Sequence, residues 1–189
     1  MPRKRVIVVT DGDRQAAAAV EQAARNVDCR CVSLSGGHGP HDAYLEPEEV
    51  VKLVLAAPSD PVVVMVDDEG QLGEGRGERI LRHFVEHSGI EVLGVVAVAS
   101  DAQRDLGVEV TESVSRNGDM VSGPVNKEGI PQKACYQQGD TLGVLRDVHV
   151  PVVIGLGDPG KMGHADDACQ GAPLTTKALK AILAHHSRV

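Results

Sequence analysis

Short runs of β-branched residues, separated by segments with helical periodicity, constrain this chain more than any other feature. The runs are Arg5–Thr10, Cys29–Leu34, Pro61–Val66, Val92–Ala99 and Pro151–Gly155. They are nearly continuous in apolar residues, which is typical of strands buried on both faces of a parallel sheet. The segments between the first four runs are long enough for helical, right-handed crossovers. We therefore predict a three-layer, Rossmann-like α/β fold with a mostly parallel sheet and helices on both faces.

Helical periodicity places the other elements. The predicted helices are Ala16–Val27, a helix from Pro47 through Leu55, Glu78–His87, a short one near Thr141–Val148, and Thr175–His186. The alternation of strands and helices becomes less regular after Asp101. Residues 108–121 alternate roughly between apolar and polar residues and contain an Asn-Gly pair, which favours an antiparallel hairpin at the edge of the sheet. Since no repeat or linker interrupts the chain, we predict one α/β domain over residues 1–189.

Composition excludes several classes of function. The net charge is −8, and the chain has only two Tyr, one Phe and no Trp. A protein that binds phosphate backbones or stacks on bases is therefore not expected, and we predict no nucleic-acid partner. The basic cluster Arg3–Arg5 flanks the first strand, with contact to an anionic surface as the alternative reading.

No apolar run approaches the roughly 20 residues that span a bilayer, and the N-terminus lacks a signal peptide. We therefore expect the protein on the cytoplasmic side of a membrane. The four cysteines, Cys29, Cys31, Cys135 and Cys169, form no C-x-x-C pair, so they support neither a zinc ribbon nor a redox motif. We interpret them as buried structural residues.

Acidic residues follow three of the predicted strands. Since the carboxyl ends of parallel strands share one edge, these loops are expected to converge there. The glycines of the second and third loops would let backbone groups approach a ligand. The predicted ligand-binding residues are Asp11, Asp13, Asp67, Asp68, Glu69, Gly70, Gly75, Gly77, Asp158, Gly160 and Lys161. Asp11, Asp67 and Asp158 are the predicted ligands of Mg²⁺ or Ca²⁺. Helix caps and solvated turns are the alternative.

The stretch from Gly155 to Lys161 matches part of a nucleotide-binding P-loop. Met162 stands where Ser or Thr should hold Mg²⁺, and Pro159 removes a backbone N–H from the cradle. A looser anion site at Lys161 and nearby amides remains open. His83 and His87 lack the zinc-protease pattern, and no G-x-S-x-G supports a hydrolase triad.

Several motifs together resemble one family. These motifs occur in order along nearly the whole chain: VTDGD, VMVDD with the following GEG and GE, GVVAVAS, VNKEGIP, and GDPGKMG with ADD and GAPLTTKA. In this the chain is similar to the stage V sporulation protein AE family of endospore-forming bacteria. The loop Gly36–Glu46 departs from the family pattern, so no role is carried over to it.

The resemblance implies a role in spore formation and germination, linked to movement of calcium–dipicolinate across the spore inner membrane. It also implies peripheral association with that membrane or with the spore interior, and companion proteins of the same operon as partners. It implies no known reaction and no catalytic residues, so we favour an accessory protein over an enzyme. The alternatives are a Mg²⁺-dependent phosphoryl-transfer or phosphatase-like enzyme and a purely structural interaction module. The sequence leaves a homo-oligomer open.

Overall fold

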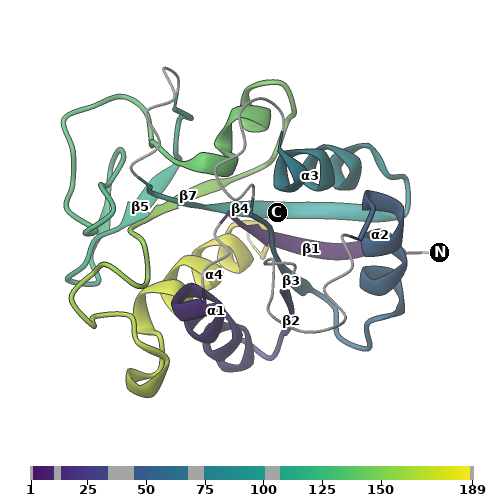
Figure 1. The fold of residues 1–189 in the computed structure, drawn as a ribbon, viewed down its shortest axis with the longest axis horizontal. Helices are drawn as coiled ribbons and strands as arrows, with labels where there is room; N and C mark the ends of the chain where they lie inside the picture. The colour runs from purple at the N-terminus through teal and green to yellow at the C-terminus, as the bar shows by residue number, and fades with distance from the viewer. Residues whose placement is uncertain (1, 11–13, 34–44, 68–74, 101–106, 188–189) are drawn as a thin grey trace.

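The computed structural model describes residues 2–10, 14–33, 45–67, 75–100 and 107–187. Seven strands form one sheet in the order β2-β3-β1-β4-β7-β5-β6 (Figure 1). The strands are β1 (Lys4–Val9), β2 (Arg30–Ser33), β3 (Val62–Met65), β4 (Ile90–Val98), β5 (Glu112–Val114), β6 (Met120–Val121) and β7 (Val153–Leu156). All neighbouring pairs are parallel except β5 with β6, which confirms the predicted α/β sheet.

Helices cover both faces of the sheet. Helices α1 (Arg14–Asn26) and α4 (Pro173–His186) lie on one face, and α2 (Pro47–Ala56) and α3 (Arg76–Glu86) lie on the other (Figure 1). Two 3₁₀ helices, η1 (Asp140–Arg146) and η2 (Ala168–Gln170), complete the elements. The helix predicted near residues 141–148 is thus a 3₁₀ helix.

Two apolar clusters explain why the strand sequences are almost continuously apolar. In β1, Ile7 and Val9 belong to the cluster under α1 and α4, whereas Val6 and Val8 belong to the cluster under α2 and α3. All four side chains are fully buried. A strand covered on both faces has no side that favours polar residues, so the usual alternation disappears.

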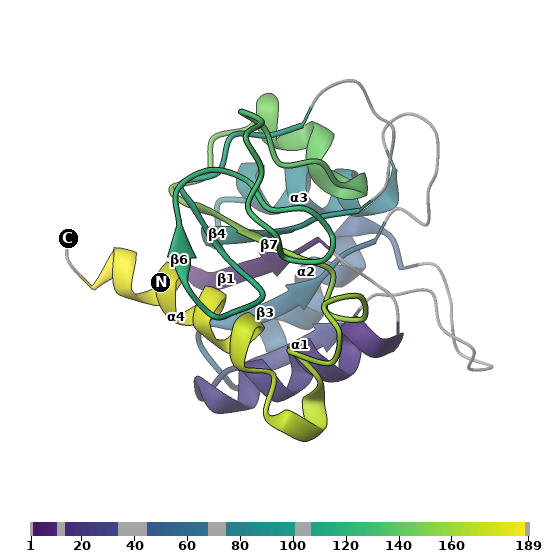
Figure 2. The same cartoon turned by 90° about the vertical axis from the view of Figure 1, so that its left-hand side faces the viewer.

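The antiparallel hairpin is present but shorter than its sequence pattern. Only Ser113 with Val121 and Val114 with Met120 are paired between β5 and β6. Val108, at the start of the predicted hairpin, instead forms an antiparallel bridge with Gln137. The chain between residues 115 and 139 runs over the ends of β4 and β7 (Figure 2).

The N-terminal basic cluster contacts the body of the protein. Lys4 Nζ donates to the Ala57 carbonyl at 2.7 Å, and Arg5 pairs with Asp60 at 3.2 Å. Arg3 and Glu91 approach to 3.9 Å. These contacts favour the interpretation that the cluster flanks β1. In the part of the chain that is described, no helix has the length and apolarity needed to cross a membrane.

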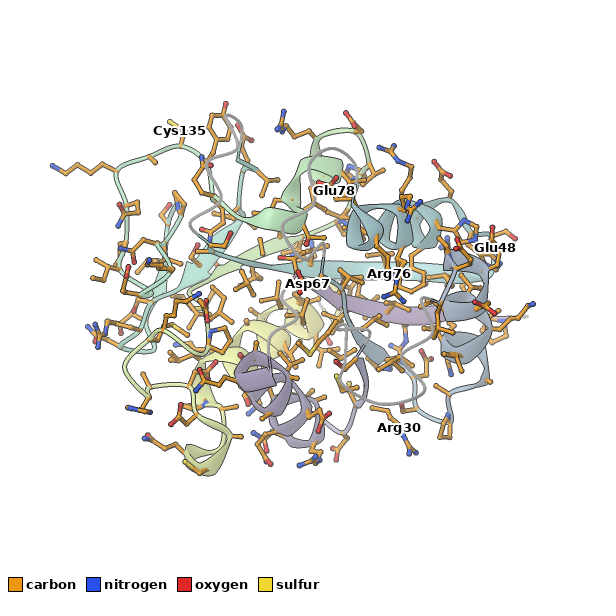
Figure 3. The ribbon with its side chains drawn as sticks, in the orientation of Figure 1. Arg30, Glu48, Asp67, Arg76, Glu78 and Cys135 are labelled. Atoms are coloured by element: carbon orange, nitrogen blue, oxygen red, sulfur yellow. The ribbon has the colours of Figure 1, made fainter. Side chains whose placement is uncertain are left out.

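The prediction of buried cysteines is wrong for two of the four. Cys29 is buried and Cys31 is half-buried, but Cys135 and Cys169 are exposed. Cys135 lies in an irregular segment and Cys169 in the three-residue 3₁₀ helix η2, where sequence periodicity carries no information about burial. Cys135 lies at the periphery of the molecule (Figure 3).

Candidate functional site

The carboxyl ends of the parallel strands meet at one edge of the sheet. Val9 at the end of β1 is in register with Met65 of β3 and with Val96 of β4, and Val98 is in register with Leu156 of β7. Because α1 and α3 follow neighbouring strands but cover opposite faces, the chain has a topological switch point between β1 and β3. Such a point is the usual ligand position in open α/β sheets.

Five of the predicted ligand-binding residues belong to the loops at this switch point and lie outside the described residues. They are Asp11, Asp13, Asp68, Glu69 and Gly70. In the sequence they come shortly after β1 and β3. Whether their side chains converge stays a prediction.

The structure describes three other predicted ligand-binding residues of the second loop, which differ in burial and in position: Asp67, Gly75 and Gly77. Asp67 is half-buried and lies two residues after the end of β3, near the centre of the view in Figure 3. Gly75 is the N-cap of α3, and Gly77 lies buried in its first turn. The helix therefore begins two residues earlier than Glu78, and the two glycines form its start rather than an open loop.

Asp158 begins a turn in which neighbouring residues bind its carboxylate. Its Oδ1 accepts a hydrogen bond from the Gly160 N–H at 2.9 Å, and its Oδ2 forms an ion pair with Lys161. The Lys161 N–H donates to the Asp158 carbonyl at 2.8 Å, which closes the turn. The side chain of Asp158 is only 6% exposed, whereas that of Lys161 is 51% exposed. The first α-helix after this turn is α4, so the chain does not form a P-loop.

This geometry limits which of the predicted metal ligands could bind the same ion. β1 and β4 separate β3 from β7, so Asp67 and Asp158 follow strands that lie about 14 Å apart. A metal ion at Asp158 would also have to displace Lys161. The residues described therefore do not fit one ion bound by both aspartates, and Asp11 lies outside them. Among the described residues, no group of three His, Cys, Asp or Glu side chains could hold a metal ion.

The Asp158 turn interlocks with the loop of residues 126–130. The Asp158 N–H donates to the Lys127 carbonyl at 2.8 Å. A Cβ added to Gly157 would lie 2.6 Å from the Gly129 nitrogen and 2.6 Å from the Met162 sulfur. Gly129 has a φ of 71°, and a Cβ added to it would lie 2.8 Å from the sulfur of Met162, which is fully buried. Glycine is required at both positions because the two loops touch through their backbones.

A cavity of about 250 Å³ opens beside this interlock, at the carboxyl end of β4. We call it the edge cavity. It is lined by Ala99, Ser100, Pro124, Val125, Asn126, Lys127, Glu128, Gln132, Ala134, Tyr136 and Gln138. Its lining combines the Lys127 ammonium group, the Glu128 carboxylate, a phenol ring and several amides, which are the convergent polar groups of a small-molecule site.

Gln137 holds one wall of the edge cavity. Its side chain is fully buried, and its Nε2 donates to the carbonyls of Ala97 in β4 and Leu156 in β7, at 3.2 and 3.3 Å. Its Oε1 accepts from the Val125 N–H at 2.9 Å. The neighbouring side chains at 136 and 138 line the cavity, so one buried amide fixes the residues on both sides of it.

Sequence reasoning missed the edge cavity. None of its lining residues was predicted to bind a ligand, although the motif VNKEGIP contains Asn126, Lys127 and Glu128. The sequence feature that could have indicated this loop is the pair Asn126 and Gly129, since asparagine and glycine are typical turn residues. The Asn126 side chain accepts from the N–H groups of Glu128 and Ile130 at 3.1 and 2.9 Å, which shapes the loop.

A larger hollow of about 580 Å³ lies between α1 and the amino ends of β2 and β3. Cys29 and Cys31 line it. Burial raises the pKa of Cys31 to about 12 and also raises the pKa of Cys29. Because these thiols stay protonated at neutral pH, they are poor nucleophiles and poor metal ligands there. The hollow also lies at the amino ends of the strands, opposite the carboxyl edge where ligands of open α/β sheets bind. We therefore favour the edge cavity as the ligand site.

Asp166 is the most buried carboxylate among the residues that the structure describes, but its role is structural. It accepts hydrogen bonds from the N–H groups of Leu174 and Thr175 at 2.7 and 3.0 Å, at the start of α4. Burial raises the pKa of Asp166, while its hydrogen bonds to Thr175 and Leu174 oppose that rise. The ADD motif therefore caps a helix.

These features define a doubly wound α/β protein with a polar cavity at the carboxyl edge of a parallel sheet. The chain belongs to the stage V sporulation protein AE family: the family described as stage V sporulation protein AE1 matches residues 5–186. It is thus a sporulation-related protein, as the resemblance of its motifs implied. No curated protein and no solved structure matches the chain.

Proposed function

We propose that this protein is a non-enzymatic accessory of spore formation and germination that binds a small ligand in the edge cavity. The observation that carries the proposal is the place of this cavity, at the carboxyl end of β4. Ligands of open α/β sheets bind at that edge. The neighbouring Asp158 turn, whose backbone is bonded to Lys127, supports the cavity wall.

Calcium–dipicolinate is the ligand we propose, because the family is associated with its movement across the spore inner membrane. The Lys127 ammonium suits a carboxylate, and the Tyr136 ring offers a flat surface to an aromatic ligand. Asp67 does not line the edge cavity, so it would contact the cation only where the Ca²⁺ end of the ligand projects out of the cavity toward β3. Companion proteins of the dipicolinate channel would be the partners, with the protein held at the membrane periphery.

Thermal unfolding with Ca²⁺, Mg²⁺, dipicolinate, and calcium with dipicolinate tests the proposal. A ligand at 100 times its dissociation constant stabilises a protein by about 2.7 kcal/mol. For a chain of this size that corresponds to a Tm increase of roughly 5–10 °C. We expect this increase for the wild type with calcium–dipicolinate and its loss in Lys127→Ala.

Lys133→Ala is the matched control, because Lys133 is an exposed lysine of the same segment that does not line the edge cavity. It should keep the full Tm increase. A wild type that responds to none of the four additions would contradict small-ligand binding. A response to Mg²⁺ alone that Asp67→Asn abolishes would instead favour the Mg²⁺-dependent enzyme.

A further inference from the structure

Two side-chain amides of the edge cavity, those of Asn126 and Gln132, have orientations fixed by the backbone around them. Asn126 Oδ1 accepts hydrogen bonds from the N–H groups of Glu128 and Ile130 at 3.1 and 2.9 Å. Because two N–H groups require an oxygen acceptor, this amide cannot be turned the other way. Its Nδ2 is therefore the atom that can donate a hydrogen bond to a ligand.

The Gln132 amide has the opposite orientation. Its Nε2 donates to the carbonyl oxygens of Ile130 and Pro131 at 2.9 and 3.3 Å. Since two carbonyls require a donor, the Gln132 Oε1 is the atom that can accept from a ligand or contact a cation. The lining thus has a donor at Asn126 and an acceptor at Gln132, although both residues are amides.

Glu128 is the one carboxylate among the described residues that line the edge cavity, and it is half-buried. Its backbone N–H is bonded to Asn126, but within the described part of the chain the carboxylate forms no hydrogen bond or ion pair. Burial removes part of the water around a carboxylate, and a bound cation would compensate for that loss. Lys127 is the other charged residue of this lining, so the cavity carries one charge of each sign.

We propose that Glu128 and Gln132 contact the cation of a metal–carboxylate chelate, while Asn126 donates to one of its carboxylate oxygens. In a chelate the ligand's own oxygens hold the metal, so the protein supplies only the remaining oxygen contacts. A site of three His, Cys, Asp or Glu side chains is then not required, and none occurs among the described residues. The inference rests on the proposed function, since it assigns the cation contact within the same cavity.

Calorimetric titration with dipicolinate, in excess Ca²⁺ and in metal-free buffer, tests this assignment. We expect the wild type to bind the calcium complex at least about tenfold more tightly than metal-free dipicolinate. Glu128→Gln removes the charge with little change of shape, so it should bind both forms with about equal affinity. Glu112→Gln is the matched control, because Glu112 is an exposed glutamate of β5 that does not line the edge cavity. It should keep the tenfold difference.

Asn126→Asp is the second variant, because aspartate keeps the oxygen that accepts from the loop but replaces the amide donor with another oxygen. It should keep a cooperative melting transition and bind metal-free dipicolinate about tenfold more weakly than the wild type does.

The outcomes separate this inference from the proposed function. If the wild type binds dipicolinate equally well with and without Ca²⁺, or if Glu128→Gln keeps the tenfold difference, the inference is overturned and the proposed function stands. Unchanged binding of metal-free dipicolinate by Asn126→Asp would overturn the donor role of Asn126. A wild type that binds neither form would overturn the proposed function and this inference with it.

Discussion

The β2-β3-β1-β4 half of the sheet is held by apolar packing, whereas the β7-β5-β6 half depends strongly on side chains that bond main-chain groups. In the first half, fully buried residues such as Val8, Val64 and Phe84 fill both faces. In the second half, Ser113 Oγ donates to the Gly123 carbonyl at 2.7 Å, and Gln137 joins three segments.

This difference accounts for the edge cavity, whereas the larger hollow beside α1 lies in the first half, at the outer strand β2. Apolar side chains interdigitate to a high density and leave little space. A segment tied down by individual hydrogen bonds can stand away from its neighbours, as residues 123–139 do around the edge cavity. We therefore expect substitutions in the first half to change global stability, and those in the second half to change stability and ligand binding together.

Phe84→Ala should have the largest effect on stability. Phe84 is fully buried in the cluster between α3 and the sheet, and such truncations cost about 3–5 kcal/mol. Chemical denaturation should show this loss with the affinity for any ligand unchanged at temperatures where the variant is folded. A loss below about 1 kcal/mol would contradict the packing of α3.

Gln137→Leu should come next, with a loss of about 3 kcal/mol. The change keeps the approximate volume but leaves the buried Val125 N–H without its acceptor and removes two donated bonds. Gln138→Leu alters an exposed neighbour and should change the free energy of unfolding by less than about 0.5 kcal/mol. Equal losses in the two variants would contradict the role given to Gln137.

Asp166→Ala should cost about 2 kcal/mol, because it removes the acceptor of two buried N–H groups at the start of α4. Asp166→Asn retains an acceptor and should cost less. Thermal unfolding of both variants would measure the difference.

The pH dependence of Asp166→Asn tests the effect of burial. Since burial raises the pKa of Asp166, the folded protein holds this proton to higher pH than the unfolded chain. This stabilisation is fully present below the ordinary aspartate pKa of about 3.9 and is lost as pH rises through the folded value. The Tm of Asp166→Asn relative to the wild type should therefore rise as pH increases above about 4. A relative Tm that falls over this range would mean that the hydrogen bonds outweigh burial.

Lys161→Ala should have the smallest effect of these core and turn variants, about 0.5–1 kcal/mol, because the Lys161 side chain is half-exposed although its partner Asp158 is buried. The hydrogen bond from Gly160 still holds the Asp158 carboxylate in this variant. If Lys161→Ala nevertheless reduced ligand binding, the anion site predicted at Lys161 would gain support.

The regular half of the fold was predictable because its signals are periodic. Strands such as β1 and β4 are recognisable from their β-branched runs, and α3 from the spacing of Ile80, Leu81 and Phe84. The parallel arrangement of the strands that the three acidic loops follow was also predicted, and the register of β1, β3, β4 and β7 confirms it.

The irregular half was not predictable because its contacts depend on single side chains. Nothing in the local pattern shows that Gln137 reaches Ala97 and Leu156, which are distant in sequence. Similarly, the pairing of Asp158 with Lys161 follows from a turn whose closure the sequence only partly specifies. The strand order, which separates Asp67 from Asp158, depends on packing between distant elements.

Isothermal titration calorimetry with calcium–dipicolinate tests the central claim most directly, comparing the wild type with Lys127→Ala, Lys133→Ala and Asp67→Asn. We predict one site per chain in the wild type and in Lys133→Ala, with binding weakened at least about tenfold in Lys127→Ala. Binding that is unaffected by Lys127→Ala but lost in Asp67→Asn would move the site to the switch point. No heat of binding in the wild type at millimolar ligand would contradict a ligand site in the edge cavity.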